Sequence, residues 1–379
     1  MAGEILDRKI FDDLLNGIRS GVYPSGTRLP SEIELAEKYG VSRITSKKAL
    51  EMLADRDMVL RRPGKGTFVT WQGTSNPAVE ESDFPDDSAP ATGEKATPDV
   101  IGVIFDSIDV SFGYEVLQGI TYESTRRGLL MFWRMTYGSD EAEKRAIEDM
   151  LAAGAKGIIL MCTQNKSYNP TLLKLYLNGF PMVLVDRELK GIPVPVVATD
   201  NFRAGYDLTT RLIESGHRKI GFISHSHVET STVAARFEGY CEALRDHGIM
   251  ADASNMLRNM DAYMPVEDDG NSSFAMYRNE LSEFVDNHPD LTAFYTVEFS
   301  IARLLYEILQ EKGLQDKKAL VYFDGFMGRT TPLSRNCLHI IQGQYEMGVK
   351  AVRHLAHRMR GEQVPERDYI PYTFVEPDA

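Results

Sequence analysis

The sequence predicts an α/β protein with an N-terminal domain of residues 1–71, a flexible acidic linker of residues 72–98, and a two-lobed body of residues 99–379 with parallel sheets. Length is the first observation, because 379 residues exceed one ordinary domain and suit two or three. The second is a change of pattern at Asp99, after which short β-rich runs alternate with amphipathic helices. Such alternation is typical of βαβ units and parallel sheets, and two successive sets predict two lobes.

Three helices are expected in the N-terminal domain. Apolar residues at helical spacing predict the first, and they are Ile10, Leu14, Leu15 and Ile18. Ser31 and Glu34 form a capping-box pattern that begins a second helix over 32–39, and Gly40 ends it. Ser42 is expected to cap the third helix, which lies in the stretch VSRITSKKAL.

The third helix and the hairpin after it have the residue types that a DNA-binding surface needs. One helix edge is cationic and can form hydrogen bonds, through Ser42, Arg43, Thr45, Ser46 and Lys47. Because such an edge fits the major groove, base contacts are expected from Ser42, Arg43, Thr45 and Lys47. Residues 60–69 predict a β-hairpin whose glycine-rich tip can approach phosphates closely. Contacts to the DNA backbone or minor groove are expected from Arg28, Arg61, Arg62, Gly64, Lys65 and Gly66. Together these elements describe a winged helix-turn-helix.

This N-terminal domain resembles the GntR family of bacterial transcription regulators. The resemblance runs through LPSEIELAEKYGVSRITSKKALEMLADRDMVLRRPGKGTFV, residues 29–69, which is close to the whole family signature. The family often has Arg at the position of Lys47 and Gly at the position of Asp57. Lys47 keeps the positive charge but loses the planar fork with which arginine reads guanine.

Composition and charge are those of a globular protein with a localised DNA-binding domain. The net charge is −13, but residues 1–71 carry +2, residues 72–98 carry −5 and the remainder carries −10. The part with the helix-turn-helix pattern is therefore not acidic, whereas the bulk disfavours non-specific adhesion to DNA. No apolar run of about 18 residues and no signal peptide are found, and three widely spaced cysteines suit a reducing compartment. The expected location is the cytoplasm, with no membrane partner.

The body has seven expected strands and eight expected helices. The strands cover 100–105, 129–135, 157–162, 181–185, 219–224, 293–297 and 319–323. The helices cover 114–126, 140–153, 171–178, 202–215, 232–247, 273–287, 299–312 and 345–360. In sheets of this kind, ligands bind where the carboxyl ends of the strands face a crevice.

The body resembles the effector domains of the lactose-repressor (LacI/GalR) family, which share the periplasmic sugar-binding-protein fold. The strongest motifs are TDNFRAGYDLTTRLIESGHRKIGFIS at 199–224 and ARFEGYCEAL at 235–244, in which an E-G-Y turn is expected. A GntR-type head on such a body is the combination of the arabinose-responsive repressors. The resemblance implies a homodimeric repressor that binds a pseudo-palindromic double-stranded operator and is controlled by an arabinose-like or other mono- or oligosaccharide.

The same resemblance implies a set of ligand-binding residues, most of them just past strand ends. They are Phe112, Asp186, Arg187, Arg236, Asp324 and Gln342, the last being placed on the final crossover. An aromatic ring can stack on a sugar, and carboxylates with guanidiniums can hydrogen-bond neighbouring hydroxyls. The family usually has Asn-Asp at the positions of Val297 and Glu298, and a second Asp at the position of Gly325. Taken singly, each charged residue could instead be a solvated or ion-paired surface group.

Two alternatives remain open at this point. GntR-type heads also occur on pyridoxal-phosphate aminotransferase-like bodies, but these are larger and need a Schiff-base lysine motif that is not found here. The protein could also be a cytoplasmic ligand sensor that acts on a protein partner without sugar-controlled DNA binding. No phosphate loop, nucleophile elbow or cluster of metal ligands at the required spacing occurs. We therefore expect no enzymatic activity, no cofactor and no metal.

Overall fold

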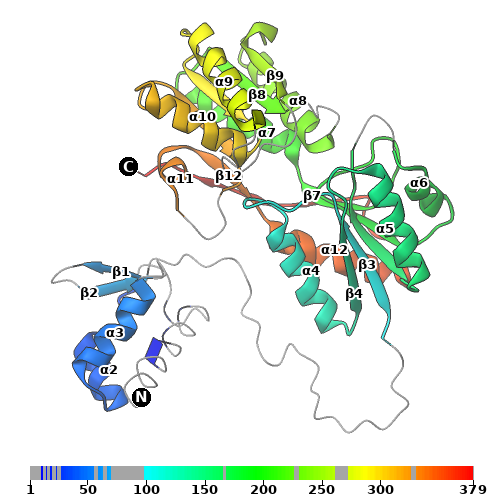
Figure 1. The fold of residues 1–379 in the computed structure, drawn as a ribbon, viewed down its shortest axis with the longest axis horizontal. Coiled ribbons are helices and arrows are strands. Elements are labelled where there is room, and N and C mark those ends of the chain that lie inside the picture. The colour runs from blue at the N-terminus through cyan, green and yellow to red at the C-terminus, as the bar shows by residue number, and fades with distance from the viewer. Residues whose placement is uncertain are drawn as a thin grey trace. The chain divides into compact units, whose positions relative to one another are not determined.

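A computed structural model describes two compact units, within Met1–Asp87 and Ser88–Ala379. The described residues are 10, 11, 14, 18, 23, 27–54, 59–62, 66–69, 98–164, 168–225, 230–260, 272–325 and 330–378. Figure 1 shows the first unit in blue and the elements of the second from cyan to red. The expected linker, apart from Pro98, lies outside the described residues. No helix among these residues is long and apolar enough to span a membrane.

The N-terminal unit has the expected helices and hairpin. Its elements are α2 (Glu32–Tyr39), α3 (Arg43–Ala54), β1 (Val59–Arg62) and β2 (Gly66–Val69), and the two strands pair antiparallel. Of the expected first helix, Ile10, Leu14 and Ile18 are described as helical and buried. They share one core with Leu35, Leu50 and other apolar residues of α2, α3 and the hairpin.

The ends of α2 follow the capping rules. The Ser31 backbone N–H donates to the Glu34 carboxylate at 2.6 Å, and the Glu34 N–H donates back to the Ser31 hydroxyl at 3.3 Å. Gly40 ends the helix at φ 62°, a left-handed conformation that suits glycine. The Ser42 hydroxyl accepts from the Thr45 N–H at 3.2 Å at the start of α3. The predicted caps are confirmed.

The larger unit contains two six-stranded sheets, which define its two lobes. The order in lobe 1 is β13-β7-β6-β5-β3-β4, and the order in lobe 2 is β14-β12-β11-β10-β8-β9. All described pairings in the two sheets are parallel except that between β12 and β14. The two orders correspond strand by strand, so equivalent strand ends lie at equivalent places in both lobes, except for β13 and the antiparallel β14.

Lobe 1 is a sheet between two pairs of helices. Its strands are β3 (Val100–Phe105), β4 (Leu130–Met135), β5 (Gly157–Met161), β6 (Met182–Val185), β7 (Val196–Thr199) and β13 (Arg367–Ile370). Its helices are α4 (Tyr114–Arg126), α5 (Asp140–Ala152), α6 (Pro170–Leu177) and α12 (Gln344–Met359). Alternation along β3 separates two cores: Val103 faces α4 and α12, whereas Ile104 faces α5 and α6. Both faces are covered, as a parallel sheet requires.

Lobe 2 repeats this plan. Its strands are β8 (Ile220–His225), β9 (Met256–Met260), β10 (Ala293–Thr296), β11 (Ala319–Phe323), β12 (His339–Gln342) and β14 (Tyr372–Val375). Its helices are α7 (Asn201–Glu214), α8 (Ser231–Asp246), α9 (Ser272–Asn287), α10 (Phe299–Glu311) and α11 (Pro332–Asn336), with a 3₁₀ turn η2 at Ala253–Asn255. The chain crosses between the lobes after β7, after β12 and between β13 and β14.

The expected E-G-Y turn is wrong, because Glu238, Gly239 and Tyr240 lie inside α8. Gly239 is where α8 crosses α7 most closely: a Cβ added there would stand 2.2 Å from the Phe202 carbonyl oxygen. The glycine is therefore required by helix packing rather than by a turn. Gln342 likewise ends β12 instead of lying on a crossover.

Candidate functional site

A cavity of about 600 Å³ lies between the lobes at the carboxyl ends of their strands. All six residues expected to bind ligand line it: Phe112, Asp186, Arg187, Arg236, Asp324 and Gln342. They come from both lobes, and the two that are farthest apart in the chain, Phe112 and Gln342, are separated by 230 positions. Strand topology therefore brings together a set that was predicted from scattered motifs.

Asp186 and Asp324 occupy equivalent places in the two lobes. Asp186 follows β6 and Asp324 follows β11, each with a left-handed backbone, at φ 63° and 62°. The backbone N–H of Asp186 donates to the Val197 carbonyl at 2.9 Å, and the backbone N–H of Asp324 donates to the Ile340 carbonyl at 2.6 Å. Aspartate tolerates this conformation better than most residues, and strain of this kind gathers at functional sites. Each carboxylate is thus held at the rim of its sheet.

Burial raises the pKa of both carboxyls. The pKa of Asp324 rises to about 7, because desolvation outweighs the nearby Arg236 charge and a hydrogen bond from the Gln342 side chain. That bond joins Gln342 Nε2 to Asp324 Oδ2 at 2.8 Å. The pKa of Asp186 is also raised by burial, opposed by the charges of Arg187 and Arg236. The Asp324 carboxyl at the cavity therefore changes its protonation state near neutral pH.

Arg187 is paired with carboxylates of lobe 1. Its Nη1 donates to Asp106 Oδ2 at 2.7 Å and to the Cys162 carbonyl at 3.2 Å, and its Nε lies 3.8 Å from Asp186 Oδ2. Burial lowers the pKa of this guanidinium, but the charges of Asp106 and Asp186 raise it further, so the net shift is upward. Arg187 is therefore a permanently charged group whose charge is compensated within the protein.

Arg236 of lobe 2 has mainly neutral partners. Its Nε donates to Asn201 Oδ1 at 2.7 Å, and its Nη1 donates to the Val297 carbonyl at 2.5 Å. The guanidinium carbon lies 3.8 Å from the centre of the Phe323 ring, a cation–π geometry. Because Arg236 is buried, these contacts fix its orientation at the wall of the cavity.

The loop that carries Phe112 is held by side-chain hydrogen bonds. One carboxylate oxygen of Asp109 accepts from the Ser111 N–H at 2.6 Å and from the Phe112 N–H at 2.8 Å. At the start of α4, Gln344 accepts from the Gly113 N–H at 2.8 Å and donates to the Ser111 carbonyl at 2.8 Å. The half-buried Phe112 ring is thus positioned at the cavity by its own loop and by α12.

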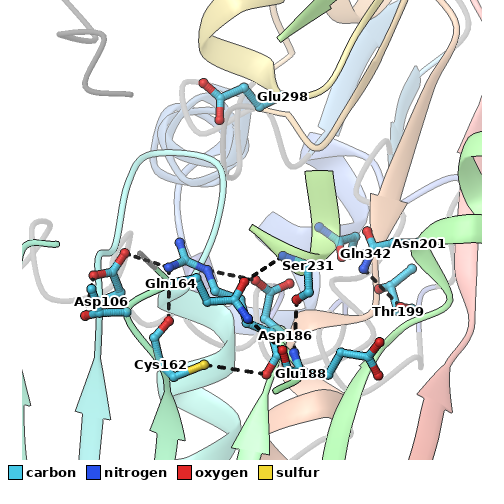
Figure 2. A network of polar contacts seen from close by, with 12 residues as sticks. Asp106, Cys162, Gln164, Asp186, Glu188, Thr199, Asn201, Ser231, Glu298 and Gln342 are labelled. Carbon is cyan, nitrogen blue, oxygen red and sulfur yellow. Dashed lines mark hydrogen bonds and ion pairs between the residues drawn. The ribbon is translucent and has the colours of Figure 1, made fainter. Parts of the chain in front are cut away.

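A hydrogen-bonded triangle joins the lobes beside the cavity. Gln164 Nε2 donates to the Glu188 carbonyl at 2.6 Å, and Gln164 Oε1 accepts from the Ser231 N–H at 2.6 Å. The Glu188 N–H then donates to the Ser231 hydroxyl at 3.0 Å. Figure 2 shows these residues close to Asp186, with Glu298 apart from the connected group. Because Ser231 begins α8, a lobe 1 side chain caps a lobe 2 helix.

Sequence reasoning missed several polar residues of the cavity, above all Asp106, Thr163 and Gln164. Asp106 Oδ1 accepts from the Thr163 hydroxyl at 3.0 Å and from the Gly138 N–H at 2.9 Å. Behind this group, the fully buried Glu143 accepts from the Thr163 N–H at 2.7 Å. Burial raises the pKa of Glu143 to about 7. Asp106 directly follows β3, so the strand-end rule could have found it.

The predicted DNA-reading edge of α3 is largely exposed. The Arg43 side chain is 69% exposed, with its Nε 3.0 Å from the Glu32 carboxylate, and Lys47 is exposed. The hydroxyls of Ser42 and Thr45 lie 2.9 Å apart. Ser46 does not belong to this edge, because it is fully buried with its hydroxyl 3.5 Å from the Ser42 carbonyl. The helical period places Ser46 toward the core.

Arg28 lies beside the hairpin. Residues 27–29 run alongside β2 and form two backbone hydrogen bonds with it. The Leu29 N–H donates to the Thr67 carbonyl, and the Val69 N–H donates to the Thr27 carbonyl, both at 2.9 Å. Gly66 has φ 115°, and a Cβ there would stand 2.7 Å from Arg28 Nε. The hairpin backbone thus passes closely over the Arg28 side chain. Arg61 and Arg62 lie on β1, while Gly64 and Lys65 are outside the described residues.

Two families match the chain. Residues 98–376 match the periplasmic binding proteins and sugar binding domain of LacI family. Residues 6–69 match the bacterial regulatory proteins of the gntR family. These matches agree with the resemblances found in the sequence.

Similar curated proteins align with most of the chain. The arabinose metabolism transcriptional repressor of Geobacillus stearothermophilus is 25% identical over 95% of this chain and 93% of its own. The HTH-type transcriptional regulator GntR of Escherichia coli (strain K12) is 25% identical over 87% of this chain and 92% of its own.

Solved structures confirm the fold of the body. The transcription regulator CcpA of Lactococcus lactis has a TM-score of 0.62 at 20% identity, covering 74% of this chain and 98% of that one. The transcriptional regulator CelR in complex with cellobiose has a TM-score of 0.63 at 18% identity, covering 91% of this chain and 98% of that one.

Proposed function

Because the chain belongs to the family of periplasmic binding proteins and LacI-type sugar-binding domains and carries a gntR-type head, we propose that it is a transcription repressor whose operator affinity is set by a sugar in the interlobe cavity. The chain is a transcriptional regulator of LacI/GntR type, like its curated relatives. The observation that carries the sugar proposal is the cavity itself, lined by all six expected residues from two lobes.

In this proposal the site binds a sugar through Phe112 and the surrounding polar groups. The Phe112 ring stacks on a sugar face, while Asp186 and Asp324 accept hydroxyl hydrogens and Arg187 and Arg236 donate to hydroxyl oxygens. Val297 contributes an apolar wall and offers only its carbonyl, which Arg236 already occupies. A polar ligand oriented by a few placed groups suits a concave cavity of about 600 Å³.

The proposed regulation is linkage between two sites. Ligand in the cavity favours one arrangement of the lobes, and in a homodimer this changes how two heads meet the half-sites of a pseudo-palindromic operator. Operator affinity then changes by the coupling free energy, typically about 1–3 kcal/mol. The protein is proposed to act in the cytoplasm, with Ser42, Arg43, Thr45 and Lys47 at base edges.

The sugar is tested by thermal unfolding of the full chain with pentoses, hexoses, sugar phosphates and short oligosaccharides. A ligand at 100 times its dissociation constant should stabilise the body by about 2.7 kcal/mol. Stabilisation by one sugar class, with a matching change in operator affinity, is the expected result. If no sugar shifts the transition while the protein still binds its operator, the ligand is not a sugar.

The head is tested by substitution at Arg43 and Lys65. Arg43→Ala should lower the ratio of specific to random-DNA affinity, whereas Lys65→Ala should weaken both equally. Arg43 is exposed, so a change in folding is not expected to explain the result. An equal loss on both duplexes for Arg43→Ala would rule it out as a base-reading residue.

A further inference from the structure

We infer that the cavity takes an uncharged sugar and excludes the corresponding sugar acids and sugar phosphates, an inference that rests on the proposed function. Five carboxyl groups line it, from Asp106, Asp109, Asp186, Glu298 and Asp324. Among the described residues that line the cavity, two guanidiniums, those of Arg187 and Arg236, oppose these carboxyl groups. An anionic ligand would have to leave water and enter a cavity whose formal charge is already negative.

Neither arginine offers an uncompensated positive charge. Asp106 holds Arg187 at 2.7 Å, and Asp186 lies 3.8 Å from the same guanidinium. The charge of Arg236 is opposed by the nearby carboxyls of Asp186 and Asp324, while its hydrogen bonds go to Asn201 and the Val297 carbonyl. A phosphate or carboxylate at Arg187 would have to share the guanidinium with Asp106, which already holds its Nη1 and opposes its charge.

Two helix starts at the cavity, those of α8 and α4, are occupied by neutral groups. A helix N-terminus is a common anion site because its N–H groups lack partners within the helix. Here the Ser231 N–H of α8 donates to Gln164 Oε1 at 2.6 Å, and the Gly113 N–H at the start of α4 donates to Gln344 Oε1 at 2.8 Å. Two glutamine amides therefore stand where an anion would otherwise be attracted.

Of the described lining residues, one more can carry a positive charge, and it is also opposed by a carboxylate. His225 Nε2 lies 3.6 Å from Glu298 Oε2, so any positive charge on that imidazole faces a negative one. Hydroxyl groups meet no such penalty, because they donate to carboxylates and accept from guanidiniums. The lining therefore selects by charge in favour of neutral polyols.

Matched ligand sets test this selectivity by isothermal titration calorimetry on the full chain. The sets are L-arabinose, D-galactose, D-glucose and cellobiose, each with its aldonate, and the 6-phosphates of galactose and glucose. The neutral sugar that binds should lose about a hundredfold in affinity when a carboxylate or phosphate is introduced. A charged form that binds within tenfold of its neutral parent, or more tightly, overturns the inference and leaves the sugar proposal intact. Binding by none of these compounds removes the sugar proposal and this inference with it.

Asp106→Asn provides the matched variant. Asparagine keeps an acceptor for Gly138 and Thr163 but removes the charge that compensates Arg187. The ratio of neutral to anionic affinity should shrink at least tenfold, whereas Asp106→Glu should keep it. An unchanged ratio in folded Asp106→Asn would contradict the role of Asp106. If Asp106→Asn fails to fold, Glu298→Gln on the half-buried far side of the cavity is expected to shrink the same ratio, and no change there overturns the charge argument.

Discussion

Lobes 1 and 2 share one topology but differ in how they treat charge. Asp186 and Asp324 follow equivalent strands with nearly equal backbone angles, at φ 63° and 62°. Around them, lobe 1 pairs its arginine, Arg187, with carboxylates, whereas lobe 2 holds Arg236 with a neutral amide, a carbonyl and an aromatic ring. The shared topology places the two aspartates at equivalent positions, whereas the side chains around them differ between the lobes and determine the local electrostatics.

The lobes also differ in where they bury a carboxyl with a raised pKa. Burial raises the pKa of Glu143 in lobe 1 and of Asp324 in lobe 2, each to about 7. Glu143 lies behind the cavity wall, where it holds the Thr163 N–H, whereas Asp324 lines the cavity. Titration of Glu143 should therefore affect stability, whereas titration of Asp324 should affect ligand binding.

The largest effect is expected when the neutral arrangement around Arg236 is broken. Arg236→Leu leaves the buried Asn201 side chain and Val297 carbonyl without their donor, and it removes the cation near Asp324. We expect a loss of about 3–5 kcal/mol in the free energy of unfolding, measured by urea denaturation. Arg258 offers the control, because it stacks on Phe237 at 3.7 Å away from the cavity. Arg258→Leu should cost about 1 kcal/mol, and equal losses would contradict the special role of Arg236.

Glu143→Gln should change how the stability of the protein depends on pH without changing ligand binding. The folded-state pKa is raised above the unfolded value, so the stability contribution is present below about pH 4.5 and is lost as pH rises through about 7. Asp140 and Asp106 add to this rise, while Thr163 and Asn169 oppose it. Glutamine removes the titration and keeps an acceptor for Thr163. At pH 8 the variant should be more stable by about 2–3 kcal/mol, with little difference at pH 4.5.

The control for that experiment is Glu141→Gln, on the exposed face of the same helix, α5. It should not change the pH dependence of unfolding. A Glu143→Gln protein that is destabilised equally at pH 4.5 and pH 8 would show that packing, rather than charge, decides the Glu143 site.

Asp324→Asn should act on binding instead. As pH rises through about 7, the Asp324 carboxyl loses its proton and becomes a stronger acceptor for sugar hydroxyls. Wild-type affinity for a neutral sugar should therefore rise about tenfold between pH 6 and pH 8. Calorimetric titration of Asp324→Asn should show no such rise, whereas Glu143→Gln should retain it. The reverse pattern would exchange the roles of the two carboxyls.

The smallest effect is expected at the contact that joins the lobes. Gln164→Ala removes two hydrogen bonds between Gln164 and Glu188 or Ser231, a change of about 1–2 kcal/mol. The ligand-free protein should shift toward a more open body, seen as a larger radius of gyration in X-ray scattering. Gln344→Ala removes a similar pair of bonds within lobe 1 and should leave the radius unchanged. Equal radii of gyration for both variants would show that the hydrogen bonds of the interlobe triangle do not hold the lobes together.

Much of the body could be predicted because its periodicity is strong. The strands at 100–105 and 319–323 and the helix at 114–126 have the predicted bounds. Strands β7, β9, β12, β13 and β14 were missed. Three of them, β9 (MLRNM), β12 (HIIQ) and β13 (RDYI), mix polar with apolar residues, so they lack the apolar run that marks the equally short β6 (MVLV) and β11 (ALVYF).

The candidate site was harder to predict than the fold. Site residues at strand ends could be predicted, as Asp186 and Asp324 show, because the topology places the carboxyl ends of the strands together. The partner of Arg187 could not be predicted, because Asp106 lies 81 residues away along the chain. Ser46 was misplaced for a different reason: a serine has no apolar signal, although its helical position faces the core. Pairings that depend on tertiary packing leave no local pattern.

The three chain crossings make each lobe discontinuous, and this bears on biosynthesis. Lobe 1 begins with β3 but needs α12 and β13 to cover and complete its sheet, and these are encoded after all but one strand of lobe 2. The apolar side chains of Ile101, Val103 and Phe105 have no covering partner from α12 until Met347 to Leu355 have been synthesised. A nascent chain that stalls before that point leaves uncovered the part of the sheet face that α12 later covers, and chaperone capture of ribosome-bound intermediates is expected to peak there.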